Sequence, residues 1–342
     1  MPRDRKTIVV TGGAGYIGSH TVRELAARGY SPVVLDDLSE GHRAAVGDAP
    51  LEVVPLGDPG AIARALEKHS PAAATLHFAA SCSVPESVKD PDLYYRNNVS
   101  TTVNLLRACR DAGIGAFIFS STAATYGNPD STPITEEHPN RPINPYGETK
   151  LVVERALPAY ERAYGMRHVV LRYFNAAGAD EKGDIGEDHE PEAHLIPLVL
   201  RAATGRAPAV TIFGTDYPTP DGTCVRDYVH VTDLAAAHVL ALERLLAGGS
   251  SALYNLGNGA GYSVREVVKA AERVTGRRIP VATGPRRPGD PATLVASSAK
   301  IARELGWKPR FGELDAIIST AWRWHESHPD GYGDRTKAAR AR

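Results

Sequence analysis

Hydrophobic residues form short, nearly continuous runs through the first half of the chain. Six of these runs are rich in β-branched residues: 7–11, 32–36, 51–56, 74–79, 116–121 and 168–174. Such runs are typical of strands that are covered on both faces. Helix-length segments alternate with them, at 16–28, 59–69, 91–112 and 145–164, and glycine, a common helix stop, follows three of the four. The alternation predicts an α/β fold, with a doubly wound parallel sheet (a Rossmann domain) over residues 1–176.

The pattern loosens after residue 176, where proline and glycine become frequent. Helices are predicted at 192–203, 232–247, 263–275, 298–305 and 312–327. We expect residues 177–330 to form mainly a smaller, mixed α/β substrate domain at the carboxyl edge of the sheet, with some later segments returning to the first domain. Residues 331–342 are polar and basic, and we expect them to form a frayed tail.

Composition narrows the class of protein. With 342 residues, 42% of them hydrophobic and 23% charged, the chain resembles a soluble globular protein of two domains. Its net charge of −1 gives no reason to expect binding to nucleic acid or to a membrane surface. No apolar run is long enough to span a membrane, and no signal region precedes the first strand. Three scattered cysteines make neither a disulfide framework nor a zinc site, which favours a reducing, cytoplasmic location.

Four glycines lie at the junction of the first strand and the first helix in the stretch "TIVVTGGAGYIGSH": Gly12, Gly13, Gly15 and Gly18. Their spacing lets the backbone turn tightly and approach a pyrophosphate, whose charge then faces the helix N-terminus. The alternative is a strand–turn–helix corner that binds nothing. The end of the second strand favours the ligand, because Asp36 and Asp37 lie 18 and 19 residues beyond Gly18. A carboxylate there accepts from a ribose 2′-hydroxyl and repels a 2′-phosphate, which predicts NAD rather than NADP.

Tyr146 and Lys150 are four residues apart in a predicted helix and therefore project from one face. A free phenol, with a pKa of about 10, is a poor base at neutral pH. A neighbouring ammonium and a cationic nicotinamide ring would lower that pKa, which makes the pair an acid–base device. Thr122, at the carboxyl end of the fifth strand, adds a hydroxyl that can relay a substrate proton to Tyr146. The alternatives are a helix face without function and a threonine that caps a turn.

Nine segments, among them "TGGAGYIGSH", "YYRNNV", "SSTAATYG", "PYGETK" and "RRPGD", follow the order found in the extended short-chain dehydrogenase/reductase family. Over about residues 6–330 the chain closely resembles the UDP-hexose 4-epimerases of that family. The resemblance implies an isomerase that holds NAD+ tightly and interconverts UDP-glucose and UDP-galactose through a 4-keto sugar. It also implies a homodimer built from the helices at 91–112 and 145–164.

The same resemblance implies the site residues, with Tyr146, Lys150 and Thr122 as the catalytic set. It assigns cofactor contacts to Gly12, Gly15, Tyr16, Ile17, Gly18, Asp36, Asp37, Leu38, Ser39, Asp58, Phe78, Ala79, Ala80, Asn97, Tyr146, Lys150 and Phe174. It assigns substrate contacts to Thr122, Tyr146, Asn175, His194, Leu195, Thr211, Ile212, Phe213, Arg226, Arg287, Asp290 and Leu294.

Three of these positions depart from the commonest pattern of the family. Thr122 stands where many members have serine, and it keeps the hydroxyl. His194 stands where other members carry asparagine, which leaves its contact with UDP open. Leu294 stands where some members carry a bulky tyrosine beside the sugar 2-position. The smaller side chain suggests that UDP-GlcNAc and UDP-GalNAc also fit, and the alternative is a leucine that only packs.

Other activities remain as alternatives. A 4,6-dehydratase would need acidic residues beside Thr122, whereas Ala123 and Ala124 follow it. A 4-epimerase of UDP-pentoses or UDP-glucuronate stays open, because the sequence does not fix the C5 substituent. A binding protein that senses NAD without catalysis would be expected to lack the Tyr146–Lys150 pair.

A long acidic loop follows the sixth strand and contains His189 and His194. It could be interpreted as a metal site, but the spacing of its residues matches no template of metal ligands. We therefore expect a solvated loop and no metal.

Overall fold

The computed structural model describes residues 5–287 and 290–334. Its centre is a parallel sheet of seven strands in the order β10-β6-β5-β4-β1-β2-β3. The strands are β1 (Thr7–Thr11), β2 (Ser31–Asp36), β3 (Leu51–Val53), β4 (Ala72–His77), β5 (Ala116–Thr122), β6 (Arg167–Tyr173) and β10 (Ala252–Leu256). The six predicted strands are confirmed. The prediction missed β10, a short strand that pairs with β6 from far along the chain.

Helices cover both faces of the sheet. The helices are α1 (Tyr16–Ala27), α2 (Pro59–Lys68), α3 (Val84–Lys89), α4 (Pro91–Tyr94), α5 (Thr101–Asp111), α6 (Pro145–Tyr164), α8 (Val231–Leu246) and α10 (Ala299–Leu305), with short 3₁₀ turns at Arg43–Val46 and Ala123–Thr125. One core joins α1 and α8 to the sheet, and a second core on the other face joins α2, α5 and α6. Alternating residues of β1 divide between these cores: Ile8 and Val10 enter the first, and Val9 enters the second.

The single helix predicted at 91–112 is interrupted. Between α4 and α5 the residues Tyr95–Ser100 form a π-helical turn. The hydroxyls of Thr101 and Thr102 donate to the carbonyls of Asn97 and Asn98, four residues earlier in each case. These bonds give the two carbonyls partners besides the helix amides, which accounts for the local widening.

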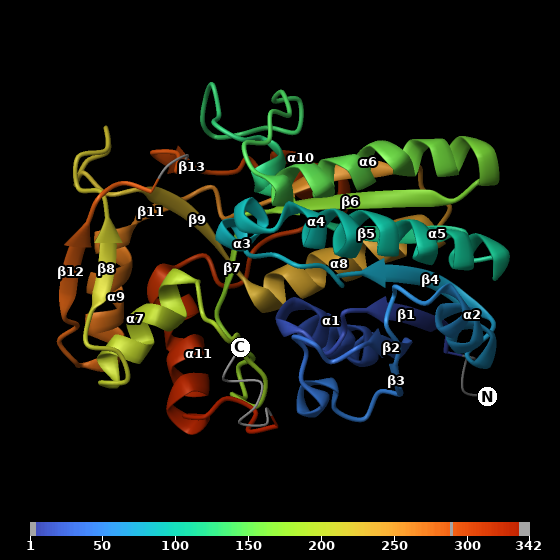
Figure 1. The fold of residues 1–342 in the computed structure, drawn as a ribbon, viewed down its shortest axis with the longest axis horizontal. Coiled ribbons are helices and arrows are strands. Elements are labelled where there is room, and N and C mark those ends of the chain that lie inside the picture. Colours follow the sequence, from blue (N-terminus) through green and yellow to red (C-terminus); the bar gives the residue numbers. More distant parts are fainter. Residues whose placement is uncertain (1–4, 288–289, 335–342) are drawn as a thin grey trace.

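A smaller layered unit lies at one end of the sheet (Figure 1). It contains a sheet of β7 (Asn175–Ala177), β9 (Val225–His230), β11 (Gly261–Ser263) and β13 (Thr293–Leu294), and a two-stranded sheet of β8 (Val210–Phe213) and β12 (Val281–Gly284). Three helices, α7 (Leu195–Ala203), α9 (Val264–Thr275) and α11 (Leu314–Ser327), share one apolar core. The helices were predicted, whereas the strands are two to six residues long and carry too little periodicity to predict.

Later segments also pack on the first part of the chain, because α8, β10 and α10 all follow residue 176. The expected tail begins later than position 331: Tyr332 stacks on His42 and its backbone amide donates to Asp188 at 3.0 Å. Residues 335–342 of that expectation lie outside the described residues. Within the described chain, no helix combines the length and the apolar character that crossing a bilayer requires.

Candidate active site

The start of α6 is set by Asn144 and Pro145. The Asn144 side chain accepts a hydrogen bond from the Gly147 amide at 2.9 Å, and Pro145 occupies the first helical position, where its missing N–H costs nothing. Tyr146 therefore lies in the first turn, and Lys150 follows one turn later on the same face. A Cβ atom at Gly147 would lie 2.5 Å from the Ala124 carbonyl oxygen. Glycine thus lets α6 approach the loop that follows β5.

The amine of Lys150 is buried under α6. Lys150 is only 4% exposed, and its Nζ donates to the Ser120 carbonyl at 3.0 Å. Nζ also lies 5.1 Å from the centre of the Phe119 ring. Burial lowers the pKa of this amine to about 8, so it stays mainly protonated at neutral pH while giving up its proton more readily than a surface lysine.

Thr122 connects the end of β5 to Tyr146. Its Oγ1 accepts from the Ala124 amide at 3.1 Å, as the turn-capping alternative expects, and its hydroxyl lies close enough to the phenol of Tyr146 to affect its ionisation. Burial raises the pKa of Tyr146 well above its usual value, and the nearby Thr122 hydroxyl acts in the opposite direction and lowers it. Lys150 is not among the causes of this shift, since its amine is directed to Ser120, and the lowering expected from Lys150 together with the nicotinamide ring stays a prediction. The other cation in that expectation, the nicotinamide ring, belongs to the cofactor.

Glu154 extends the Tyr146–Lys150 face by one further turn and anchors it. Its carboxylate forms a buried ion pair with Arg172 of β6, in which Arg172 Nε lies 2.9 Å from Oε1. The Ser121 hydroxyl of β5 donates to the same carboxylate. This anchor was missed from the sequence, although a glutamate four residues after Lys150 was a visible signal.

The glycine loop has the shape that a dinucleotide requires. Gly12 has a φ of 71° and would collide with the Ala79 backbone if it carried a Cβ, and a Cβ on Gly18 would collide with the Gly12 carbonyl. A Cβ on Gly15 would have only the Gly12 oxygen near it, at 3.4 Å. No side chain caps α1, so its first amides point into the space above Gly15. The loop therefore fits a pyrophosphate at the helix N-terminus.

Asp36 and Asp37 differ in their surroundings. Asp36 is buried, and its two oxygens accept from the amides of Ala14 at 3.0 Å and Leu38 at 2.9 Å. These bonds fix the carboxylate beside the glycine loop, and burial raises its pKa. Asp37 is exposed and accepts from the amide and the hydroxyl of Ser39 at 2.9 and 2.6 Å. Asp36 is thus the carboxylate that faces the loop.

The segment after β4 lies directly against the glycine loop. The Thr11 carbonyl at the end of β1 accepts from the amides of Phe78 at 2.9 Å and Ala79 at 3.2 Å. Ala80 follows in the same segment, at the carboxyl edge of the parallel sheet. The backbone of these residues therefore borders the space above the sheet where doubly wound folds bind ligands.

Other predicted cofactor residues lie around this edge. The phenol of Tyr16 donates to the Gly178 carbonyl at 2.6 Å, and Ile17 packs on the core under α1. Asp58 caps α2 through two backbone amides at 2.9 and 3.0 Å. Asn97, in the π-helical turn, donates to the Ser81 hydroxyl at 2.9 Å. Phe174 directly follows β6.

Residues predicted to hold UDP meet in the smaller unit. Arg226 on β9 forms an ion pair with Asp290, and Leu294 on β13 is paired with Arg226 in the parallel register. The guanidinium of Arg287 lies over the Phe213 ring, 4.0 Å from its centre. Two guanidinium groups in this area suit a diphosphate, because each can donate two hydrogen bonds to it.

The remaining predicted substrate residues have varied environments. Asn175 on β7 donates to the Asp227 carbonyl at 3.0 Å, and Leu195 is the half-buried first residue of α7. Thr211 lies half-buried on β8, and the side chain of its neighbour Ile212 is buried in the core. Ile212 can therefore face a ligand only through its backbone.

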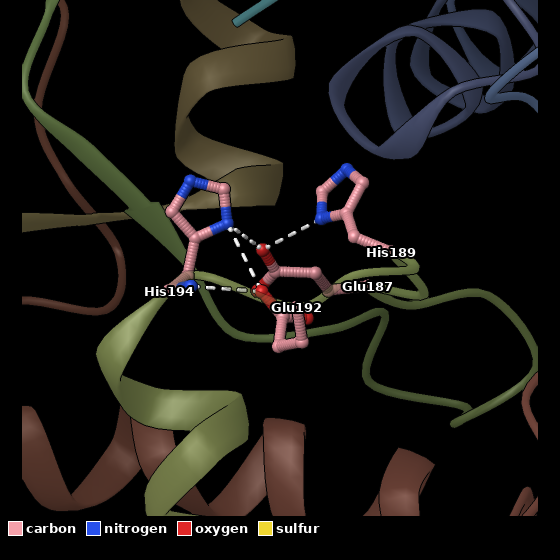
Figure 2. Close-up of side chains that lie close together, drawn as sticks. All are labelled: Glu187, His189, Glu192 and His194. Atoms are coloured by element: carbon pink, nitrogen blue, oxygen red, sulfur yellow. Dashed lines mark hydrogen bonds and ion pairs between the residues drawn. The ribbon is translucent and has the colours of Figure 1, made fainter. Parts of the chain in front are cut away.

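The acidic loop is not solvated as expected. Figure 2 shows that Glu187, His189, Glu192 and His194 point toward one another. Glu187 is only 4% exposed, and its Oε1 lies 2.6 Å from His194 Nδ1. The loop is drawn inward because Trp324 of α11 donates to the Glu187 carbonyl at 3.1 Å. His194 thus has a carboxylate partner, and its contact with UDP stays a prediction.

Two residues near the acid–base pair were missed from the sequence. Cys82 lies in the segment after β4, close enough to Tyr146, Lys150 and His194 to interact with them electrostatically. The hydroxyl of Tyr173, the last residue of β6, is bonded to the Ser120 hydroxyl. Their positions, Cys82 after β4 and Tyr173 at the end of β6, were the available signal, since ligands bind at that edge.

This combination of a dinucleotide-type sheet with a Tyr–Lys pair at its carboxyl edge defines a class of nucleotide-dependent enzymes of the α/β type. The chain belongs to the NAD dependent epimerase/dehydratase family, which matches residues 8–257. It is 51% identical to a UDP-glucose 4-epimerase from Lacticaseibacillus casei over 96% of this chain and 99% of that protein.

Solved structures agree with this assignment. The fold is similar to that of a UDP-glucose 4-epimerase from Brucella ovis in complex with NAD, with a TM-score of 0.91 and 51% identity over 93% of this chain and 97% of the other. It is also similar to a UDP-Glc/GlcNAc 4-epimerase from Campylobacter jejuni, with a TM-score of 0.82 and 40% identity over 94% of this chain and 99% of the other.

Proposed function

We propose that the protein is an NAD-dependent 4-epimerase that interconverts UDP-glucose and UDP-galactose. The observation that carries the proposal is that the phenol of Tyr146 lies beside the Thr122 hydroxyl, one helical turn from the buried amine of Lys150. This arrangement lies at the sheet edge that also holds the glycine loop. The relatives described above, which are UDP-sugar 4-epimerases, support the same reaction.

The protein groups divide the work of proton transfer. Tyr146 accepts the proton of the sugar 4-hydroxyl, and Thr122, beside the phenol, orders the hydroxyl and relays its proton. Lys150 keeps a positive charge beneath the site and so favours the phenolate when the pair is in use. Glu154 holds the helix that carries both residues.

The NAD-binding residues proposed are the glycine loop, Asp36 and the segment 78–80. When bound, NAD would supply a reversible hydride acceptor, so the sugar is oxidised and reduced at C4 with no net redox change. The 4-keto sugar must rotate between the two hydride transfers so that its other face is presented to the cofactor. That turn requires the UDP end to be held firmly, and we assign this task to Arg226, Arg287 and Asp290.

Three further properties belong to the proposal. N-acetylated UDP-hexoses are proposed as additional substrates because Leu294 is short beside Arg226, and the Campylobacter jejuni relative named for both sugars supports this. A homodimer through 91–112 and α6 is supported by exposed aromatic residues on these segments, Tyr95 and Tyr164. Gel filtration coupled to light scattering measures the mass of the particle in solution and so tests the homodimer. A reducing cytoplasmic location is proposed from the three free cysteines.

The test is incubation of the pure protein with UDP-galactose and, separately, UDP-GalNAc, without added NAD, followed by chromatography of the sugars. Conversion of UDP-galactose supports 4-epimerisation with a retained cofactor, and conversion of both supports the wider substrate range. If neither sugar reacts even after NAD is added, the proposal fails for hexoses, and UDP-pentoses and UDP-glucuronate are the next substrates to assay.

A further inference from the structure

We propose that Glu187, His189, Glu192 and His194 bind one divalent transition-metal ion of the Zn²⁺ type. The four side chains come from a single loop before α7, and each directs one ligand atom toward a common point (Figure 2). These four atoms all lie within 4.8 Å of one another. Two imidazole nitrogens and two carboxylate oxygens suit Zn²⁺, whereas Mg²⁺ and Ca²⁺ prefer six or more oxygen ligands.

The spacing of the ligand atoms fits a small tetrahedral ion. Bonds of about 2.0–2.2 Å in a tetrahedron place neighbouring ligand atoms about 3.4 Å apart. Glu187 Oε1 lies 3.2 Å from His189 Nδ1, and His194 Nδ1 lies 3.5 Å from Glu192 Oε1. The separation of Glu187 Oε1 from His194 Nδ1, 2.6 Å, is shorter and would open when an ion enters.

The two carboxylates of this cluster favour the binding of a cation. The side chains of Glu187 and Glu192 are 4% and 1% exposed, so two carboxylates are buried together. Among the described residues neither carboxylate forms an ion pair with a lysine or an arginine, and the basic groups within ion-pair distance of them are the imidazoles of His189 and His194. Buried carboxylates are costly unless they are paired or coordinate a metal.

Hydrogen bonds do not account for the arrangement. Glu187 Oε1, His189 Nδ1 and Glu192 Oε2 are buried and have no hydrogen bond of ordinary geometry within the described chain. Glu192 Oε1, in contrast, is fixed by the amides of Ala193 and His194, both at 2.8 Å. The backbone therefore holds the Glu192 carboxylate in place. The other ligand atoms lie near it, but they are not aligned as donors and acceptors of hydrogen bonds. Ligands arranged around a cation position have this geometry.

The ion would have a structural task. The ring of His189 meets the ring of Tyr16 edge-on at 6.3 Å, and Tyr16 is the first residue of α1, directly after the glycine loop. His194 is the N-cap residue of α7. A metal at this point would tie the loop to the first turn of α7 and hold it against the glycine loop. Zn²⁺ has no redox chemistry of its own, so this task adds no step to the epimerase reaction.

The test uses the full-length protein without a polyhistidine tag, treated with a chelator and then titrated with Zn²⁺ at pH 7.5 in competition with a chromophoric chelator. We expect one equivalent of Zn²⁺ per chain and a higher midpoint of thermal unfolding with the ion than without it. Co²⁺ in place of Zn²⁺ is expected to give the intense visible bands of a tetrahedral site. His189→Ala and Glu192→Gln are each expected to lower the Zn²⁺ affinity at least about 10-fold, the smallest effect found for groups that only support metal ligands.

The matched control is His69→Ala. His69 pairs with Glu52 at 2.8 Å in a second histidine–carboxylate contact that lies outside the proposed site, so this variant should bind Zn²⁺ like the unmodified protein. Circular dichroism of every variant separates loss of metal from loss of fold. If the unmodified protein binds no more Zn²⁺ than His189→Ala, and Zn²⁺ leaves its unfolding midpoint unchanged, the four residues are a metal-free ion-pair cluster and the proposal is overturned. UDP-galactose turnover is measured separately and does not decide this point.

Discussion

Glu154 on α6 and Arg172 on β6 form a buried ion pair, with Arg172 Nε 2.9 Å from Glu154 Oε1. The guanidinium of Arg172 also lies over the Tyr126 ring, 4.7 Å from its centre. Because Glu154 is one turn beyond Lys150, the pair fixes the helix that carries the acid–base residues to the strand behind it. The precision of the candidate site therefore depends on a contact that touches no ligand.

Replacing Glu154 with alanine should destabilise the protein strongly, because it leaves the Arg172 charge buried and unpaired. We expect a loss of about 3–5 kcal/mol in the free energy of unfolding. Urea unfolding followed by circular dichroism measures it. The double variant Glu154→Leu/Arg172→Met should recover a large part of the loss, since removing both charges removes the unpaired one. A single variant as stable as the unmodified protein would contradict the assigned role.

Tyr146→Phe should remove the proton acceptor while leaving the shape of the site intact. We expect the turnover of UDP-galactose to fall by about 10²–10⁴-fold, the usual contribution of general acid–base catalysis. Binding of UDP, measured by calorimetry, should change little. The exposed Tyr95 offers a matched control, and Tyr95→Phe should keep full turnover. Equal loss of UDP binding and turnover would instead indicate a positional role for Tyr146.

Lys150 should make stability depend on pH in an unusual direction. Burial lowers its pKa from 10.5 to about 8, so between these values the unfolded chain binds more protons than the folded chain. Raising the pH through this window relieves the cost of the buried charge, and stability rises. The difference in unfolding free energy between the unmodified protein and Lys150→Met should shift by about 2 kcal/mol in favour of the unmodified protein from pH 7.5 to 9.5. Urea unfolding at several pH values measures this, and a flat difference would rule out the lowered pKa.

Gly147→Ala should push the start of α6 away from the loop after β5, because its Cβ would lie 2.5 Å from the Ala124 carbonyl oxygen. We expect a loss of about 1–3 kcal/mol in stability and a lower turnover number as Tyr146 separates from Thr122. Gly115→Ala is the control, since a Cβ at Gly115 meets no atom within 4 Å. If both variants behave alike, the close approach at Gly147 does not matter.

Leu294→Tyr tests the proposed substrate range. A larger side chain beside Arg226 should lower kcat/KM for UDP-GalNAc at least about 10-fold while UDP-galactose is still converted, because a pocket discriminates by steric exclusion of the added group. Leu294→Met, with a similar volume, should leave both rates near those of the unmodified protein. Equal turnover of UDP-GalNAc by the unmodified protein and Leu294→Tyr would mean that Leu294 only packs.

Sequence patterns predicted the long elements because each carries its own signal. The strand at 116–121 and the helix at 145–164 bury a continuous side or face, and both appear almost unchanged as β5 and α6. β10 was missed because its place is set by pairing with β6, some 80 residues earlier, and not by a local pattern.

The candidate site was predictable where a residue type and its position on the sheet suffice. Tyr146, Lys150 and Thr122 were predicted in this way, since the position of each follows from the order of strands and helices. The environment of each group was not predictable. The hydrogen bond of Lys150 to Ser120 and the burial of Glu187 depend on packing between distant segments, and an acidic loop gives no sign in sequence that α11 will cover part of it.

The seventh strand of the central sheet has a consequence for the order of events at the ribosome. β6 is complete when residue 173 has been made, but its neighbour β10 begins only at residue 252, and α8, which packs against α1, begins at residue 231. Until then the edge of β6 has unpaired backbone groups and the apolar face of α1 lacks its cover. A self-contained nucleotide-binding module would fold by itself, but we expect a fragment ending at residue 176 to aggregate. During synthesis, residues 1–176 therefore remain prone to aggregation until β10 and α8 have been made.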